Sequence, residues 1–184
     1  VGEVQSVIGY CGGGILSFSI HNTDMICQFA GYDPVAVSAS IEGGGDVPDG
    51  YEPEPAPVAS TIAFGSGVQG FHVGHPGKTP SFAVDVLGSE GSLRAGFYLQ
   101  PTLRDADGAV VDNATLGLPP NVGPFKIAYE QITAHLDGGP APHCSGSDWV
   151  AVNEIGFATI ESGITGRRID LPCSNRERLI FANG

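Results

Sequence analysis

Hydrophobic and polar residues alternate along the middle of the chain, between Ala59 and Asp112. Phe71 and Val73 are a typical pair, and the same period of two recurs in the runs that follow. Side chains at that period lie on one face of a strand. The turn-forming sequences GSG, HPGKTP, GSEG and DADG separate the runs. The pattern therefore predicts antiparallel strands joined by short turns, with one apolar face that needs a cover.

Three other segments, 15–30, 124–139 and 148–166, have apolar residues at helical spacing. Gly31 stands where the first helix should end, and Pro124 stands where the second should begin. We expect the apolar stripes of these helices to cover the sheet. In the second helix that stripe consists of Phe125, Ala128, Ile132 and Leu136.

The remaining segments complete an α+β domain. Ser147 or Asp148 is expected to cap the third helix, and residues 43–57, GGGDVPDGYEPEPAP, predict an exposed loop. Helices and strands segregated in this way indicate a mostly antiparallel open sheet with helices on one face. Shorter strands are predicted at 3–10, 35–42 and 167–172. The face of the sheet left for water or for another subunit presents Ser81, Asp85, Arg94 and Tyr98.

Length and charge exclude several classes of function. The 184 residues fit a single domain, 1–184. Twenty acidic residues against eight basic ones give a formal net charge of -12, which would repel nucleic acid and anionic membranes. No apolar run approaches the roughly 18 residues of a membrane span. The chain begins at Val1 without a methionine or a leader, so we expect a processed product or part of a longer protein.

The sequence gives no convincing nucleotide or metal site. A dinucleotide fingerprint needs Gly-x-Gly-x-x-Gly and an acidic residue about twenty positions later. The stretch VIGYCGGGILS has a different spacing, and Asp33 lies in a predicted turn. His72 and His75 point to opposite faces of a strand, so one metal ion could not easily bind both. None of the four cysteines belongs to a Cys-x-x-Cys pair, and all are expected to be free thiols.

Three polar residues near the start of the first predicted helix are the best candidates for chemistry. His21 and Asp24 are three positions apart and share a helical face, and Ser17 lies one turn earlier. A histidine can transfer a proton near neutral pH, and a nearby carboxylate could orient it or raise its pKa. The preceding glycines would let a ligand approach. The alternative is a partly buried histidine satisfied by a neighbouring group.

The segment GGGILSFSIHNTDMICQFAG resembles the start of the carboxy-terminal domain of the glucose-fructose oxidoreductase, inositol dehydrogenase and rhizopine catabolism (Gfo/Idh/MocA) family. In that family a glycine pair leads into a helix with an aspartate, a histidine four residues later and another aspartate three beyond. VDVLGSEGSLR is similar to a strand, turn and strand of the family, and the stretch from AYEQITAHL to GRRIDLP is similar to its closing helices and last strand. Together these segments span most of residues 2–172.

The resemblance implies that the chain is the carboxy-terminal substrate and oligomerisation domain of an oxidoreductase. An amino-terminal Rossmann domain, absent from this chain, would bind NAD or NADP and provide a catalytic lysine, so this chain alone would be inactive. A sugar, polyol or related hydroxy compound would bind at Ser17, His21 and Asp24, with His21 taking part in proton transfer. The open sheet face would pair subunits into a homo-oligomer, and the enzyme would be cytoplasmic.

Ser17 departs from the family pattern, because it occupies the position of the first aspartate. A serine cannot hold the charge that fixes and polarises a histidine. A second hypothesis is therefore a non-catalytic binding or dimerisation scaffold that keeps the fold. A third is an unrelated lectin-like or hydrolase domain, although the sequence has no Gly-x-Ser-x-Gly elbow, and Glu52 and Glu54 lie in the predicted loop without a visible partner.

Overall fold

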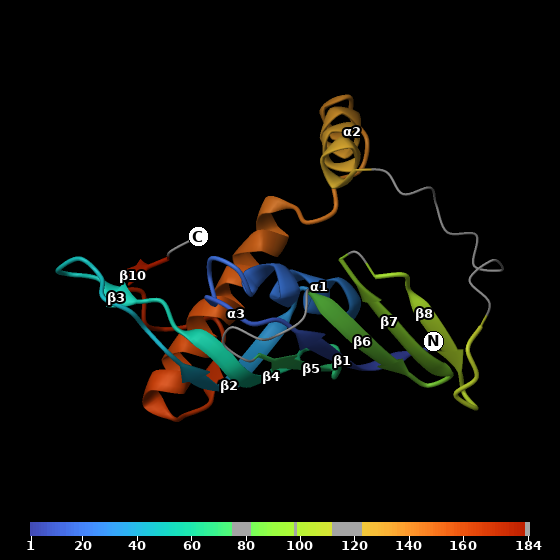
Figure 1. The fold of residues 1–184 in the computed structure, drawn as a ribbon. Helices are drawn as coiled ribbons and strands as arrows, with labels where there is room; N and C mark the ends of the chain where they lie inside the picture. The colour runs from blue at the N-terminus through green and yellow to red at the C-terminus, as the bar shows by residue number, and fades with distance from the viewer. Residues whose placement is uncertain (75–81, 98, 112–122, 183–184) are drawn as a thin grey trace.

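The structure is a computed structural model, and it describes residues 1–74, 82–97, 99–111 and 123–182 (Figure 1). The helices are α1 (Ile20–Ala30), α2 (Pro124–Leu136) and α3 (Gly146–Thr165). The strands are β1 (Val4–Tyr10), β2 (Pro34–Glu42), β3 (Glu52–Pro53), β4 (Ala56–Phe64), β5 (Gln69–Val73), β6 (Ala83–Gly88), β7 (Gly91–Gly96), β8 (Thr102–Asp105), β9 (Ile169–Asp170) and β10 (Ile180–Phe181).

Eight of these strands form one open sheet in the order β8-β7-β6-β1-β5-β4-β2-β9. Neighbouring strands are antiparallel except β1 and β5, which run parallel. The predicted, mostly antiparallel sheet is thus confirmed, as are the hairpins at GSG and GSEG. The predicted hairpin pairing across HPGKTP is wrong, because β1 lies between β5 and β6. The turn HPGKTP itself lies outside the described residues.

Helices α1 and α3 cover one face of the sheet (Figure 1). Val7 of β1 and Val84 of β6 belong to the same buried cluster as Ile26 of α1 and Ile155 of α3. Each of these four side chains is essentially inaccessible to water, and burial of an aliphatic side chain contributes about 1.5–3 kcal/mol. The layers follow from the sequence pattern, since period-two strands and amphipathic helices each bury one apolar side. The predicted α+β class is confirmed.

Helix α1 begins at Ile20, later than the predicted start at residue 15. The residues before it form turns in which Phe18 and Ser19 both donate their amides to the Gly14 carbonyl. This segment is docked on the link between β3 and β4, because the amide of Ile15 donates to the Pro55 carbonyl at 3.0 Å. The helix ends at Gly31, as predicted, with a positive φ of 104° that favours glycine.

The prediction that helix α2 covers the sheet is wrong. The stripe residues Phe125 and Leu136 are each 80% exposed, and Figure 1 shows α2 standing apart from the layer of α1 and α3. The periodic pattern did predict the helix, which begins at Pro124. Period alone cannot say which surface the apolar stripe covers.

The start of helix α3 differs from the prediction by a few residues. Its N-cap is Ser145 rather than Ser147 or Asp148. Asp148 completes a capping box, since its carboxylate accepts the Ser145 amide at 2.7 Å. The sequence predicts that Gly163 to Gly166 end this helix; Gly163 lies inside it instead, and the helix ends before Gly166, whose left-handed φ of 65° closes it.

The segment predicted as one exposed loop, 43–57, is only partly so. Its second half forms β3 and the start of β4, and β3 pairs in parallel with β10 near the carboxy terminus. The last strand of the main sheet, predicted at 167–172, is shorter, since β9 pairs with β2 over two residues. Among the described residues, no helix is both long and apolar enough to cross a membrane.

Candidate functional site

His21 lies in the first turn of α1 beside a group of aromatic rings. Its exposed imidazole has its centroid 6.0 Å from that of Phe82 and 6.5 Å from that of Trp149. Phe82 in turn packs on Phe18 at 4.7 Å and on Phe97 at 5.3 Å. We call Phe18, Phe82, Phe97 and Trp149 the aromatic shelf. The sequence predicted His21 but not the shelf. Phe18 lies only three residues before His21, whereas Phe82, Phe97 and Trp149 come from distant parts of the chain.

Asp24 lies one turn beyond His21 and binds other partners. Its carboxylate accepts from the Gln28 amide at 2.9 Å and from the Tyr32 hydroxyl at 2.8 Å. Burial, together with this carboxylate, raises the pKa of Tyr32 and raises that of the nearby Cys144 thiol to about 11. Among the described residues, no carboxylate is hydrogen-bonded to His21. Asp24 shares an element with His21, but it holds Tyr32 in place rather than orienting the imidazole.

Ser17 is bound to Glu54, a residue for which the sequence suggests no partner. The Ser17 hydroxyl donates to Oε2 of Glu54 at 2.7 Å. Oε1 of the same carboxylate accepts the backbone amides of Leu16 at 2.5 Å and of Ser17 at 2.7 Å. Bonds from N–H and O–H groups to a carboxylate are charge-assisted and strong. The expectation that Glu54 has no partner is therefore wrong, and no local sequence signal joins two residues so far apart in the chain.

The glycine turn has a different role from the one predicted for it. A Cβ on Gly14 would lie 2.4 Å from the Glu54 carboxyl carbon and 2.5 Å from the Ser17 hydroxyl oxygen. The glycine thus makes room for the protein's own carboxylate at this point rather than for a ligand.

The same geometry bears on a dinucleotide. A pyrophosphate needs free backbone amides at a glycine-rich helix start. Here the amides of Leu16 and Ser17 already bind Glu54, and a second anion would face that carboxylate. The residues of this turn therefore do not fit the pyrophosphate of NAD or NADP.

The other candidate ligands lie in separate places. His72 is buried in β5, where its Nε2 lies 3.0 Å from the Cys11 carbonyl oxygen, and burial lowers its pKa to about 4. His75 lies outside the described residues. The four cysteines are free thiols. Within the described part of the chain, no group of three or more histidine, cysteine or acidic side chains could hold a metal ion.

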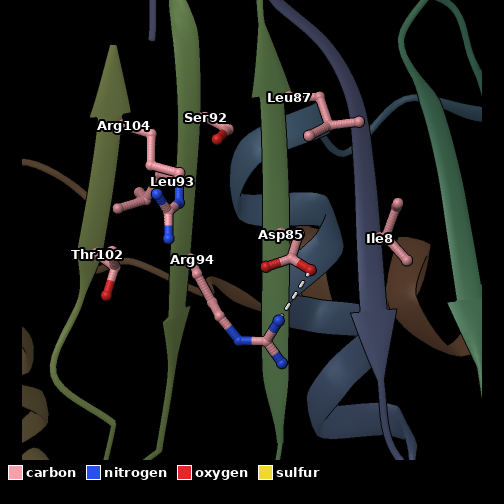
Figure 2. A pocket seen from close by; sticks show the side chains of 8 residues that line it. All are labelled: Ile8, Asp85, Leu87, Ser92, Leu93, Arg94, Thr102 and Arg104. Carbon is pink, nitrogen blue, oxygen red and sulfur yellow. Dashed lines mark hydrogen bonds and ion pairs between the residues drawn. The ribbon is translucent and has the colours of Figure 1, made fainter. Parts of the chain in front are cut away.

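The uncovered face of the sheet has a shallow hollow of about 380 Å³ over β8, β7, β6 and β1. Figure 2 shows Arg94 reaching across to Asp85, with which it makes an ion pair at 3.2 Å. The guanidinium also lies 5.4 Å from the centre of the Tyr10 ring. Asp85 and Arg94 thus lie on the open face, as predicted, whereas Ser81 and Tyr98 lie outside the described residues.

The site around His21 has the composition of a binding surface, because aromatic side chains beside a few polar groups are typical of small-molecule sites. The other two predicted site residues are bound within the protein, since Ser17 donates to Glu54 and Asp24 accepts from Tyr32.

Comparison with solved structures identifies the class of fold. Levoglucosan dehydrogenase, in complex with NADH and L-sorbose, is similar over 94% of this chain and 60% of its own, with a TM-score of 0.71 and 20% identity. The similarity to aldose-aldose oxidoreductase from Caulobacter crescentus, complexed with glycerol, covers 93% of this chain and 56% of the other chain, with a TM-score of 0.70 and 20% identity. The similarity to an oxidoreductase from Agrobacterium radiobacter, in complex with NAD+, L-tartaric acid and magnesium, covers 92% of this chain and 57% of the other chain, with a TM-score of 0.62 and 18% identity.

The chain therefore has the fold found in these oxidoreductases, and the Gfo/Idh/MocA resemblance is confirmed at the level of the fold. The chain spans about 56 to 60% of the length of the three structures named. No protein-family model matches the chain, and no curated protein sequence matches it.

Proposed function

We propose that this chain is the carboxy-terminal substrate-binding and oligomerisation domain of an NAD(P)-dependent oxidoreductase that acts on a sugar, a polyol or a related hydroxy compound. The observation that carries the proposal is the exposed His21 beside the aromatic shelf, in a domain with the fold of sugar oxidoreductases. The aromatic rings would bind the carbon skeleton, and the imidazole would accept or donate the proton of the reacting hydroxyl group.

NAD or NADP, when bound, would supply the hydride chemistry of the reaction. Its pyrophosphate would be held by an amino-terminal Rossmann domain outside this chain, because Glu54 already occupies the amides of the glycine turn. The additional length of the similar structures supports this arrangement. This chain by itself would then be inactive, while still presenting His21 and the shelf to the substrate.

The uncovered face of the sheet would pair with a second copy of the chain. Leu87 on this face is 40% exposed and lines the shallow hollow beside Asp85 and Arg94. A partner copy would cover Leu87 together with the polar and charged side chains around it. The four free cysteines are compatible with a reducing, cytoplasmic location.

Trp149 allows substrate binding to be measured directly, since it is the only tryptophan in the 184 residues and its ring lies 6.5 Å from His21. The longest natural polypeptide that contains this chain is titrated with a panel of sugars and polyols while tryptophan emission is recorded. The proposal predicts a saturable change with at least one compound. This signal should disappear in Trp149→Phe, and any emission change that remains in that variant comes from another tryptophan of the longer polypeptide. Binding should weaken in His21→Ala. No saturable change with any member of the panel would contradict the proposal.

A non-catalytic scaffold is the second candidate, and one observation favours it. The carboxylates of Asp24 and Glu54 bind Tyr32 and Ser17, so neither is hydrogen-bonded to the imidazole of His21. A scaffold would bind the sugar or the second copy without turnover. The two candidates are separated by adding NAD+ or NADP+ to the binding-competent protein and following formation of the reduced cofactor.

A further inference from the structure

The carboxy-terminal tail, residues 174–182, is attached to the short strand β3. Strands β3 and β10 pair in parallel, and the Glu52 amide donates to the Leu179 carbonyl at 2.8 Å. The rings of Tyr51 and Phe181 meet edge to face, with their centroids 5.7 Å apart. The tail therefore fixes the position of β3, because it provides the paired strand, the Glu52 hydrogen bond and the Phe181 ring contact.

Arg178 in this tail links β3 to helix α3. Its Nε donates to Oε2 of Glu161 at 2.6 Å, and its Nη1 donates to Oε2 of Glu52. The side chains of Arg178 and Glu161 are only 15% and 16% exposed. The hydrogen bond from Arg178 holds the pKa of Glu161 below its usual range. A partly buried guanidinium that binds two carboxylates at once defines a geometry that lysine cannot reproduce.

Glu54 follows Glu52 by two residues and extends the connection to the site. Its carboxylate holds the amides of Leu16 and Ser17 and the hydroxyl of Ser17. Phe18 of the aromatic shelf follows Ser17 directly, and His21 lies one turn further along the chain. A continuous series of contacts therefore runs from α3 through Arg178, β3 and Glu54 to the turn that places the imidazole.

We propose that Glu54 is a positioning residue for the His21 site, and that Arg178 of the carboxy-terminal tail holds Glu54 in place. The proposal rests on the proposed function only in naming the site as the place of substrate binding. The physical connection is testable without any substrate.

The test is amide hydrogen exchange, read residue by residue by NMR in the full chain. Glu54→Ala should speed exchange at Leu16 and Ser17 by about tenfold or more, because the charge-assisted bonds that it removes each contribute more than that factor. Arg178→Met should also speed exchange at both amides by about tenfold, because it releases β3 and with it the Glu54 carboxylate. Glu54→Gln should have a smaller effect, since its amide oxygen can still accept both N–H groups. The core amide of Val84 should remain strongly protected, which shows that the variant is folded.

A matched control is available in the same tail. Arg176 makes its own ion pair with Glu154 of α3, and among the described residues no hydrogen bond or ion pair joins its side chain to β3. Arg176→Met should therefore leave exchange at Leu16 and Ser17 within about threefold of wild type, below the loss expected for a charge-assisted bond. The His21 ring gives the second readout: the chemical shifts of its ring protons at one fixed pH should change in Glu54→Ala and Arg178→Met and remain unchanged in Arg176→Met.

Two results would overturn the inference. One is wild-type exchange at Leu16 and Ser17 in Arg178→Met or Glu54→Ala. The other is equal acceleration in Arg176→Met, which would show general loosening of the tail. If the exchange pattern holds but no sugar or polyol binds, the positioning role survives and the proposed function alone fails.

Discussion

The Ser17 hydroxyl donates a hydrogen bond to Glu54, and this contact determines how a substitution of Ser17 would affect stability. An aspartate here would restore the carboxylate of the family pattern, but its oxygens would face the Glu54 carboxylate that now lies 2.7 Å from the serine hydroxyl. Two unpaired carboxylates at that distance repel each other. We predict that Ser17→Asp destabilises the protein by about 1–3 kcal/mol, measured by urea unfolding at neutral pH.

The double variant Ser17→Asp with Glu54→Gln should recover most of that loss, because a glutamine amide can donate to the new carboxylate. Ser17→Ala should cost about 1 kcal/mol, the value of one hydrogen bond. An unaltered midpoint in Ser17→Asp would show that the Glu54 contact is absent in solution.

His72 predicts how stability depends on pH. Its pKa is lowered to about 4 from 6.5 because it is buried, so between these values the unfolded chain binds a proton that the folded chain does not. Stability is therefore lost as pH falls from about 6.5 to about 4, by up to about 3 kcal/mol. Unfolding free energies are measured across this window for wild type and for His72→Gln, which can still donate to the Cys11 carbonyl. If the two proteins show the same pH slope, His72 is not the cause.

Single residues were predictable from the sequence where their chemistry is local. His21 and Asp24 were placed correctly on one helix, because three-residue spacing determines neighbours on a helical face. Their partners were not predictable. Asp24 accepts a hydrogen bond from Tyr32 and Ser17 donates one to Glu54. The ring of Trp149 lies beside that of His21. Such pairings depend on how distant segments pack, which periodicity does not encode.

Helix α3 packs closely on β2 at Gly163. A Cβ at this position would lie 2.4 Å to 2.7 Å from three side-chain atoms of Ile41. We predict that Gly163→Ala costs about 1–3 kcal/mol through overpacking, measured by thermal or urea unfolding. Gly146→Ala in the first turn of the same helix meets nothing within 4 Å and should be neutral or stabilising by up to about 1 kcal/mol. Equal effects of the two changes would contradict this packing.

Helix α2 is predicted to contribute little to the stability of the domain. Its stripe residues Phe125 and Leu136 are 80% exposed, whereas Ile155 of α3 is 1% exposed. Phe125→Ser and Leu136→Ser should each change the unfolding free energy by less than about 0.5 kcal/mol. Ile155→Ala should cost about 2–5 kcal/mol. A comparable loss in Phe125→Ser would show that α2 packs against the body of the protein.

Helices and strands were predicted well where the spacing of apolar residues on one face defines them. They were predicted poorly where the result depends on strand order or on contacts with distant segments. The period of two predicted β6 and β7, and Gly31 and Gly166 end their helices. The insertion of β1 between β5 and β6 was not predictable, because it is a long-range pairing between apolar strands of equal suitability. The start of α1 was missed because Pro55 and Glu54 capture the amides of residues 15–17.

At the scale of the whole molecule, one layer of helices and one open sheet leave two surfaces for function. The helical side presents His21 and the aromatic shelf, and the open side presents Asp85, Arg94 and Leu87. The sequence predicted both layers, and it predicted His21 on the first surface and Asp85 and Arg94 on the second. Under the proposed function, the first surface would bind the substrate and the second would bind the partner copy.

The most direct test is turnover by the longest natural polypeptide that contains this chain, with NAD+ or NADP+ and the sugar or polyol that binds most tightly. The account predicts reduction of the cofactor, and a fall in kcat of about 100-fold or more in His21→Gln, the usual value of a general acid or base. His135→Gln, on the exposed helix α2, should retain wild-type turnover. Wild-type kcat in His21→Gln, or no reduction of either cofactor with any compound that binds, would contradict the account.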